Sequence, residues 1–156
     1  MDIVDQLFAI EAIKQLKARY FRLMDTKDWD GLRHVFCDDA IFDARASLSI
    51  DGQAEEGPAA ESNGWVYEGG DTIIDFIRGA IGVNTTVHHG HCHEISVESD
   101  TLASGVIAME DQIWEPDGKT VLHGTGHYHE TYHCVDGQWR IHRSRITRLS
   151  VRLGDA

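Results

Sequence analysis

The sequence contains few basic residues. Its 14 Lys and Arg residues stand against 26 Asp and Glu residues, which gives a formal net charge of −12. Nucleic acids and anionic membrane surfaces are bound through clustered Lys and Arg, so this balance argues against both kinds of partner. The one basic cluster, residues 140–148, alternates like a strand. We interpret its basic residues as partly a contact to an anion or carboxylate and partly protein surface.

Cysteine is also scarce. Cys37, Cys92 and Cys134 are odd in number and show no Cys-x-x-Cys spacing, which favours a reduced, cytoplasmic setting. The N-terminus lacks the basic and apolar segments of a signal peptide. No apolar run approaches the ~20 residues that a membrane helix needs. We therefore expect a cytoplasmic protein with no membrane partner.

Three common catalytic motifs are missing. The sequence has no nucleophile elbow, no P-loop and no Gly-x-Gly-x-x-Gly fingerprint. Acyl transfer, nucleotide hydrolysis and dinucleotide binding therefore have no support in the sequence.

The first half of the chain shows helical periodicity. Apolar residues at helical spacing predict a helix over 4–26, a short helix over 29–36 capped by Asp28 or Asp30, and a third over 71–82 with Asp71 as its N-cap. Residues 40–50 are expected to form a first strand. Residues 51–70 lack periodicity and are interpreted as a long loop and a candidate lid.

The second half is typical of long strands. We expect strands over 86–98, 101–114, 119–135 and 138–152, with turn signals between them; the Asp136-Gly137 pair is a strong hairpin signal. Helices followed by an antiparallel meander indicate an α+β fold in one domain of 156 residues. This order excludes a βαβ Rossmann arrangement.

Two acidic residues stand in unusual places. Asp111 shares its predicted strand face with three apolar residues, namely Ile107, Met109 and Ile113. A carboxylate there must be paired, hydrogen-bonded or protonated, unless the strand phase is wrong and Asp111 is a surface acid. Asp25 ends the first helix, where a negative charge is unfavourable by ~0.3–1 kcal/mol when exposed. Tyr20, five residues earlier, fits a cavity residue or a core aromatic equally well.

Histidine is the most concentrated residue. Eight of the ten histidines lie between His88 and His133, and four fall within residues 87–94. Strict alternation of the first cluster gives one face made of His89, His91, His93, Ile95 and Val97. His88 then lies on the opposite face, unless a bulge near Gly90 brings it into phase. A later stripe is expected at the surface or at a subunit contact: His123, His127, His129 and His133.

A metal site is the alternative reading of the first cluster. His91 and His93 give two imidazoles, and Glu98 follows them, as in the first metal motif of cupin barrels. The second cupin motif is absent, so we expect no metal.

Several segments resemble SnoaL-like proteins of the NTF2-like superfamily. They cover most of the chain outside residues 44–70 and comprise residues 10–25, 29–30, 87–91, 109–111, 126–128 and 136–141. Among enzymes with this kind of domain, the chain resembles bile acid 7α-dehydratase and, more distantly, scytalone dehydratase and hexachlorocyclohexane dehydrochlorinase. The resemblance implies a cone-shaped α+β barrel, with three N-terminal helices on a curved, mostly antiparallel sheet that encloses a hydrophobic pocket.

The same resemblance implies a set of site residues. Five polar residues match in type those that surround the substrate of that dehydratase: Tyr20, Asp25, His88, Asp111 and Arg148. Three further residues are expected to contact the substrate: His91, Met109 and Tyr128.

The expected activity is elimination from a steroid- or polyketide-like cyclic substrate, with an Asp-His dyad and no cofactor. Two alternatives remain open. One is an isomerase or cyclase that uses the same dyad, and the other is a non-catalytic ligand-binding or assembly module. By resemblance, a homo-oligomer, either a dimer or a trimer, is expected. Fold alone does not decide between these functions.

Overall fold

The computed structural model describes residues 1–48 and 64–154. Its described helices are α1 (Ile3–Asp25), α2 (Trp29–Arg33) and α4 (Gly70–Ile81). Its described strands are β1 (Phe36–Asp43), β2 (Val66–Glu68), β3 (Thr85–Val97), β4 (Leu102–Trp114), β5 (Thr120–Val135) and β6 (Gln138–Leu153). Within these residues, no helix is both long enough and apolar enough to cross a membrane.

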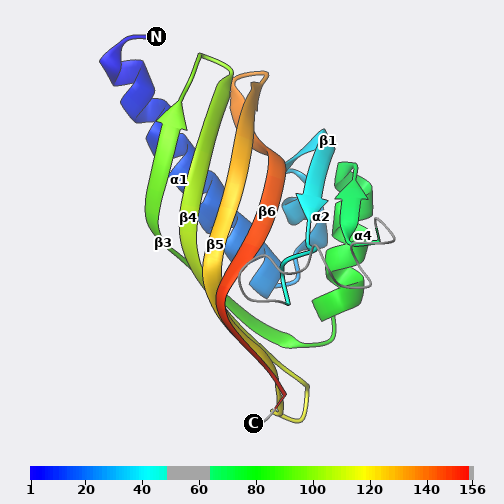
Figure 1. The fold of residues 1–156 in the computed structure, drawn as a ribbon. Coiled ribbons are helices and arrows are strands. Elements are labelled where there is room, and N and C mark those ends of the chain that lie inside the picture. The colour runs from blue at the N-terminus through cyan, green and yellow to red at the C-terminus, as the bar shows by residue number, and fades with distance from the viewer. Residues whose placement is uncertain (49–63, 155–156) are drawn as a thin grey trace.

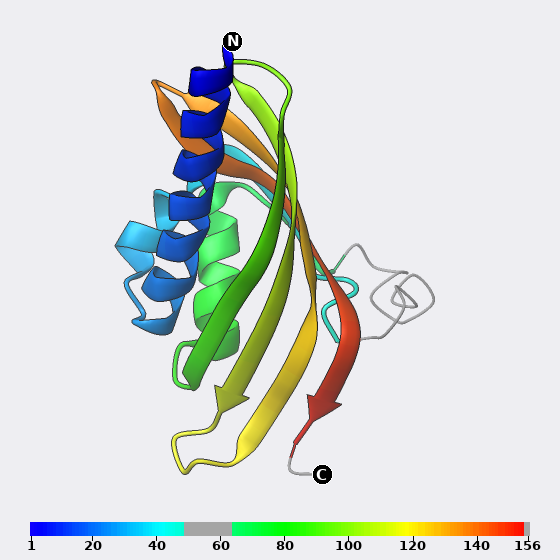
Figure 2. The same cartoon turned by 90° about the vertical axis from the view of Figure 1, so that its left-hand side faces the viewer.

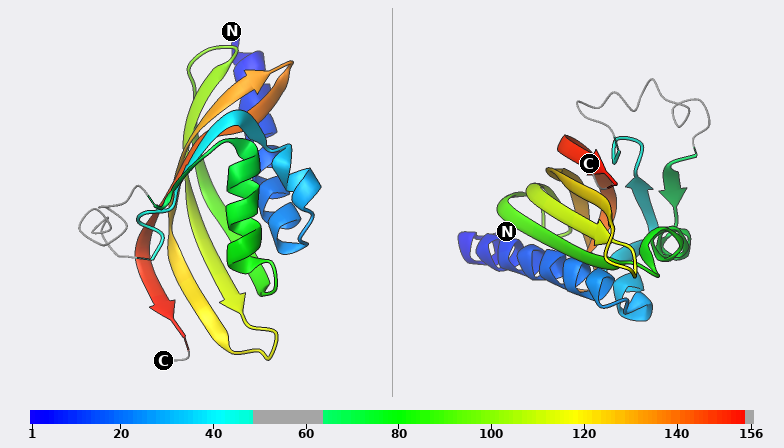
Figure 3. Two further views of the ribbon diagram at one scale, coloured as in Figure 1. Left: turned by 90° about the vertical axis from the view of Figure 1, so that its right-hand side faces the viewer. Right: turned by 90° about the horizontal axis from the view of Figure 1, so that it is seen from below.

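The strands form one curved sheet in the order β2-β1-β6-β5-β4-β3. All neighbouring pairs are antiparallel except β1 and β6, which run parallel. The helices cover one face of this sheet, with α1 crossing β3 to β6 and α4 beside β1 (Figure 1, Figure 2). From below, the sheet curves around the helical layer (Figure 3). The predicted α+β arrangement of helices on a mostly antiparallel sheet is confirmed.

The core lies between α1 and the long strands. Ile13 and Leu16 of α1 are buried against the inward side chains of the sheet, among them Ile107, Tyr128 and Tyr132. Burial of such side chains contributes about 1.5–3 kcal/mol each. The first two turns of α1 differ from the predicted apolar face, since their large apolar side chains are exposed: Ile3, Val4, Leu7 and Phe8.

Some element boundaries were predicted wrongly. The first strand covers Phe36–Asp43 rather than 40–50. Residues 66–68, predicted as loop, form β2, which pairs with β1. Asp71 does not cap α4, because Gly69 holds the N-cap position and the Asp71 carboxylate binds Arg33 at 2.7 Å. Most of the predicted lid, residues 51–63, lies outside the described residues.

Candidate active site

A cavity of about 320 Å³ lies between the helices and the sheet. This volume is at the lower end of the range typical of small-molecule pockets. Its wall is mostly apolar, with side chains from α1, α4 and the sheet such as Met24, Phe42, Ile77, Ile113 and Ile146. Its polar lining includes four of the five predicted catalytic residues, namely Tyr20, His88, Asp111 and Arg148. Tyr128, predicted as a substrate contact, also lines it.

Asp25 and His88 form a pair at this cavity. Asp25 is the last residue of α1, and His88 follows 63 residues later in β3. His88 Nδ1 lies 2.6 Å from Asp25 Oδ1, and the main-chain N–H of His88 donates to Oδ2 at 2.8 Å. The side chain of His88 is 6% exposed. A carboxylate bound to Nδ1 selects the tautomer in which Nε2 accepts a proton.

Two residues that the sequence analysis missed hold Asp25 in place. Thr86 Oγ1 donates to Asp25 Oδ1 at 2.8 Å, and Lys27 Nζ donates to Thr86 Oγ1 at 2.8 Å. Burial raises the pKa of Asp25, but the hydrogen bonds from His88 and Thr86 and the charge of His88 outweigh it and leave that pKa lowered. Asp25 is therefore ionised at neutral pH. Thr86 precedes His88 by two residues on one strand, and this spacing is the signal that could have identified it.

Asp111 and Arg148 form a second pair, which is buried. Arg148 Nη1 donates to Asp111 Oδ1 at 2.6 Å, and Nη2 donates to Oδ2 at 2.8 Å. The Arg148 side chain is 3% exposed, and its Nε also donates to the carbonyl of Ser47 at 2.6 Å. Asp111 is buried and paired, so the alternative of a surface acid on a mis-phased strand is wrong. Both carboxylate oxygens are thus bound by the guanidinium in a bidentate arrangement.

Gly124 makes this second pair possible. Asp111 of β4 and Arg148 of β6 meet over β5, where Gly124 pairs with Asp111. A Cβ at Gly124 would overlap Arg148 Nη1 and lie 2.8 Å from Asp111 Oδ1. Any larger residue at Gly124 would therefore displace the ion pair.

Tyr20 and Tyr128 meet beside the two pairs. Their ring centroids lie 5.8 Å apart in an edge-to-face arrangement. Burial raises the pKa of Tyr20 and raises that of Tyr128, so both phenols stay protonated and can donate hydrogen bonds. Met109, predicted to contact substrate, is buried behind the cavity wall, where its Sδ accepts from Arg148 Nη1 at 3.4 Å.

A buried ion pair lies beneath the two tyrosines. Lys17 Nζ lies 2.8 Å from Glu130 Oε1, and both side chains are fully shielded from solvent. The same ammonium lies 3.9 Å from the ring centroid of Tyr20 and 4.0 Å from that of Tyr128. Glu130 also accepts from the hydroxyl of Tyr132 at 2.6 Å. This pair was not predicted, although Glu130 alternates with tyrosines on the inward face of β5.

A bulge in β3 explains why His88 faces inward. Pairing with β4 is regular up to His91, and the register shifts between His91 and Glu94, where Cys92 has φ of 48°. His88 before the bulge and Ile95 after it consequently share the inward side. The histidine that strict alternation placed outside the apolar face therefore joins it.

The predicted position of this bulge was wrong. Gly90 stays in register, and a Cβ there would overlap Phe21. The ring of Phe21 stacks on His88 with centroids 6.4 Å apart, so Gly90 serves close packing. His91, predicted as a substrate contact, lies on the exposed outer side of β3 and does not line the cavity. The bulge also places His91 and the half-buried His93 on opposite sides of β3. These two imidazoles therefore do not form the metal-binding pair that the sequence analysis considered.

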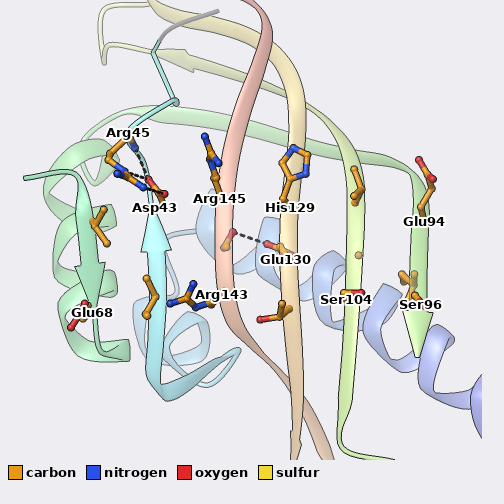
Figure 4. Close-up of a pocket in the computed structure, with 17 residues that line it drawn as sticks. Asp43, Arg45, Glu68, Glu94, Ser96, Ser104, His129, Glu130, Arg143 and Arg145 are labelled. Carbon is orange, nitrogen blue, oxygen red and sulfur yellow. Dashed lines mark hydrogen bonds and ion pairs between the residues drawn. The ribbon is translucent and has the colours of Figure 1, made fainter. Parts of the chain in front are cut away.

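The outer face of the sheet carries a larger hollow of about 940 Å³. Figure 4 shows its lining, which includes Glu94, His129, Arg143 and Arg145, with α1 behind the sheet. The predicted surface histidines of β5 are on this outer side. None of the predicted catalytic residues lines this hollow, so the inner cavity is the candidate active site.

Solved structures share this fold. A protein of unknown function from Mycobacterium tuberculosis is 26% identical, with a TM-score of 0.72 over 95% of this chain and 76% of that one. A putative scytalone dehydratase from Novosphingobium aromaticivorans is 18% identical, with a TM-score of 0.79 over 99% and 93%. A hexachlorocyclohexane dehydrochlorinase from Novosphingobium barchaimii is 16% identical, with a TM-score of 0.75 over 99% and 95%.

The sequence also matches a family model. The model describes a SnoaL-like domain, and the match runs over residues 5–145. It includes both helical and sheet layers and four of the five predicted catalytic positions. The chain therefore belongs to the SnoaL-like domain family.

Proposed function

We propose that this protein is a cofactor-free lyase that eliminates water, or another β-leaving group, from a cyclic hydrophobic substrate. The observation that carries the proposal is the Asp25–His88 pair at a mostly apolar cavity. Structural neighbours named as a dehydratase and a dehydrochlorinase support an elimination, as does the resemblance of the site residues to bile acid 7α-dehydratase.

His88 is the proposed general base. Its Nε2 removes a proton from a carbon next to a carbonyl, and Asp25 stabilises the imidazolium that results. The electron pair of the broken C–H bond forms a C=C bond, and the β-hydroxyl leaves. The proton on His88 then joins the departing hydroxide, so the products are an enone and water.

Tyr20 is the proposed hydrogen-bond donor to the oxygen that gains charge. Its phenol remains protonated because burial raises its pKa, and it lines the cavity with Tyr128. Preorganised donors of this kind stabilise a developing enolate or a leaving oxygen. Asp111, held by Arg148, is the proposed acceptor of a hydrogen bond from a substrate hydroxyl.

The substrate class follows from the cavity. Its apolar wall favours a cyclic hydrocarbon framework, and its volume of about 320 Å³ limits the size of that framework. A β-hydroxy ketone fits best, because the adjacent carbonyl acidifies the C–H bond that His88 must break.

The test is an assay of the metal-stripped protein against a panel of steroid- and polyketide-like β-hydroxy ketones. We expect enone formation by the wild type and a loss of about 10²–10⁴-fold in His88→Ala. His127→Ala removes a histidine on the outer face of β5 and is the matched control. Loss of activity on chelation, or full activity in His88→Ala, would overturn the mechanism. Product analysis separates elimination from isomerisation or cyclisation by the same dyad, and the absence of turnover across the panel would indicate a binding module.

A further inference from the structure

Three residues on the outer face of the sheet lie unusually close together. His89 and His91 are two positions apart on the exposed side of β3, and Glu110 of β4 is the register partner of His89. One donor atom from each residue lies within 4.8 Å of the other two. Among residues 1–48 and 64–154, this is the one group of three or more His, Cys, Asp or Glu side chains that is so compact.

From this cluster we propose a divalent metal site, for Zn²⁺ or a similar transition ion, formed by His89, His91 and Glu110. Two imidazoles and one carboxylate are donors that suit Zn²⁺, Co²⁺ and Ni²⁺. Zinc–ligand bonds of about 2.0–2.2 Å place tetrahedral donor atoms about 3.3 Å apart. The two histidines are exposed, so small side-chain rotations bring the donors to that spacing without disturbing the core. Water completes the coordination.

His123 of β5 supports the site from the next strand. Its Nε2 lies 2.9 Å from Oε1 of Glu110, and Gln112 donates to the same oxygen at 3.4 Å. Both contacts are made to Oε1, so they fix the orientation of the Glu110 carboxylate. A partner that orients a ligating carboxylate contributes about 10–100-fold to metal affinity.

The site is separate from the inner cavity but shares its strands. His88 pairs with Asp111 and His89 pairs with Glu110, so adjacent residues of β3 and β4 face opposite sides of the sheet. β3 is one of the two edge strands of the described sheet. A metal ion on the outer side therefore links this edge strand to β4, and it stabilises the folded state without taking part in the proposed elimination.

The first experiment measures metal binding directly. Protein without a polyhistidine tag is treated with a chelator, dialysed, and titrated with ZnCl₂ by calorimetry; CoCl₂ binding is followed by visible absorption. We expect one Zn²⁺ per chain, and binding weakened at least about tenfold by Glu110→Gln or by His123→Ala. The double substitution of His89 and His91 to Ala is expected to abolish the 1:1 binding and the cobalt spectrum.

The matched control is the double substitution of His127 and His129 to Ala. These two histidines have the same spacing on the outer side of β5, with ring centroids 6.2 Å apart, but they do not belong to the compact cluster. Zinc affinity and the zinc-induced rise in Tm should remain at wild-type values in this control. The proposal is overturned if the wild type binds no Zn²⁺ at 1:1, if Glu110→Gln binds as tightly as the wild type, or if the control loses affinity equally.

Discussion

Asp25 accepts two hydrogen bonds from His88, one from the imidazole and one from the main chain. The carboxylate therefore fixes both the ring and the backbone that carries it. A base that is already oriented avoids part of the entropic cost of reaching the reactive geometry. The unfavourable position of Asp25 at the end of α1 is compensated by these two donors and by Thr86.

Replacement of Asp25 by Asn tests the dyad. Asn keeps the size of the side chain but removes the charge that stabilises the imidazolium, so we expect kcat to fall by about 10²–10⁴-fold with a smaller change in KM. Steady-state kinetics on a substrate found in the panel provide the measurement, with circular dichroism to verify the fold. A kcat equal to that of the wild type would contradict a role for Asp25.

The same substitution has a pH-dependent effect on stability. The pKa of Asp25 in the folded state lies below the ordinary value of 3.8, so its ionised form stabilises the fold above that pH. This contribution is lost as the pH falls through the folded pKa. The free energy of unfolding, measured by urea denaturation, should therefore be higher for the wild type than for Asp25→Asn at pH 7. This difference should disappear in acid.

The control for this pH series is Asp75→Asn. Asp75 is an exposed residue of α4 that pairs with Arg78, and such surface pairs contribute about 0–1 kcal/mol. Its substitution should change the free energy of unfolding little at any pH. If the free energy of unfolding of Asp25→Asn differs from that of the wild type by the same amount at every pH, lost packing rather than charge causes the effect.

The buried pair of Asp111 and Arg148 predicts a large effect of a single substitution. Arg148→Met leaves the Asp111 carboxylate buried without its partner, which costs about 3–5 kcal/mol. The double variant Asp111→Leu with Arg148→Met should regain most of this stability but none of the activity. Lys119→Met breaks an exposed pair with Asp117 and is the control. If Arg148→Met lowers the free energy of unfolding no more than Lys119→Met does, the burial of the Asp111–Arg148 pair is contradicted.

Gly124→Ala tests the space between the same two residues. The added methyl group would overlap Arg148 Nη1, so we expect lower stability and lower activity together. Gly79→Ala is the matched control, because a Cβ at Gly79 meets nothing within 4 Å and α4 gains about 0.5–1 kcal/mol from the better helix former. The measurements are the Tm and the steady-state kinetics of both variants, prepared in parallel with the wild type. Wild-type activity in Gly124→Ala would contradict the close approach.

The sequence predicted those parts of the site that depend on local periodicity. Alternation along β4 placed Asp111 on an apolar face, and its partner Arg148 came from the resemblance. The inward position of His88 depends on a bulge at Cys92, whose backbone is left-handed. No local signal in the sequence pointed to Cys92, whereas Gly90 is the residue type that usually marks a bulge. Strand β2 is only three residues long, too short for a periodic pattern.

The buried pair of Lys17 and Glu130 shows a different limit. Lys17 occupies a buried position of α1, yet in sequence it looks like the polar residues between apolar ones. Its burial depends on Glu130, which is 113 residues away, and on the curvature of the sheet that brings the two together. Glu130 itself carried the same signal as Asp111, a carboxylate among inward-facing large residues.

The hydrogen bond from the His88 main chain has a consequence for local opening of the structure. β3 is an edge strand, so the N–H groups that point away from β4 have no neighbouring strand to bind. The N–H of His88 donates instead to the Asp25 carboxylate of α1. Amide hydrogen exchange at His88 therefore reports the docking of α1 on the sheet rather than the opening of β3 from β4. Each time the end of α1 lifts, this amide exchanges with solvent and the imidazole loses its carboxylate at the same moment.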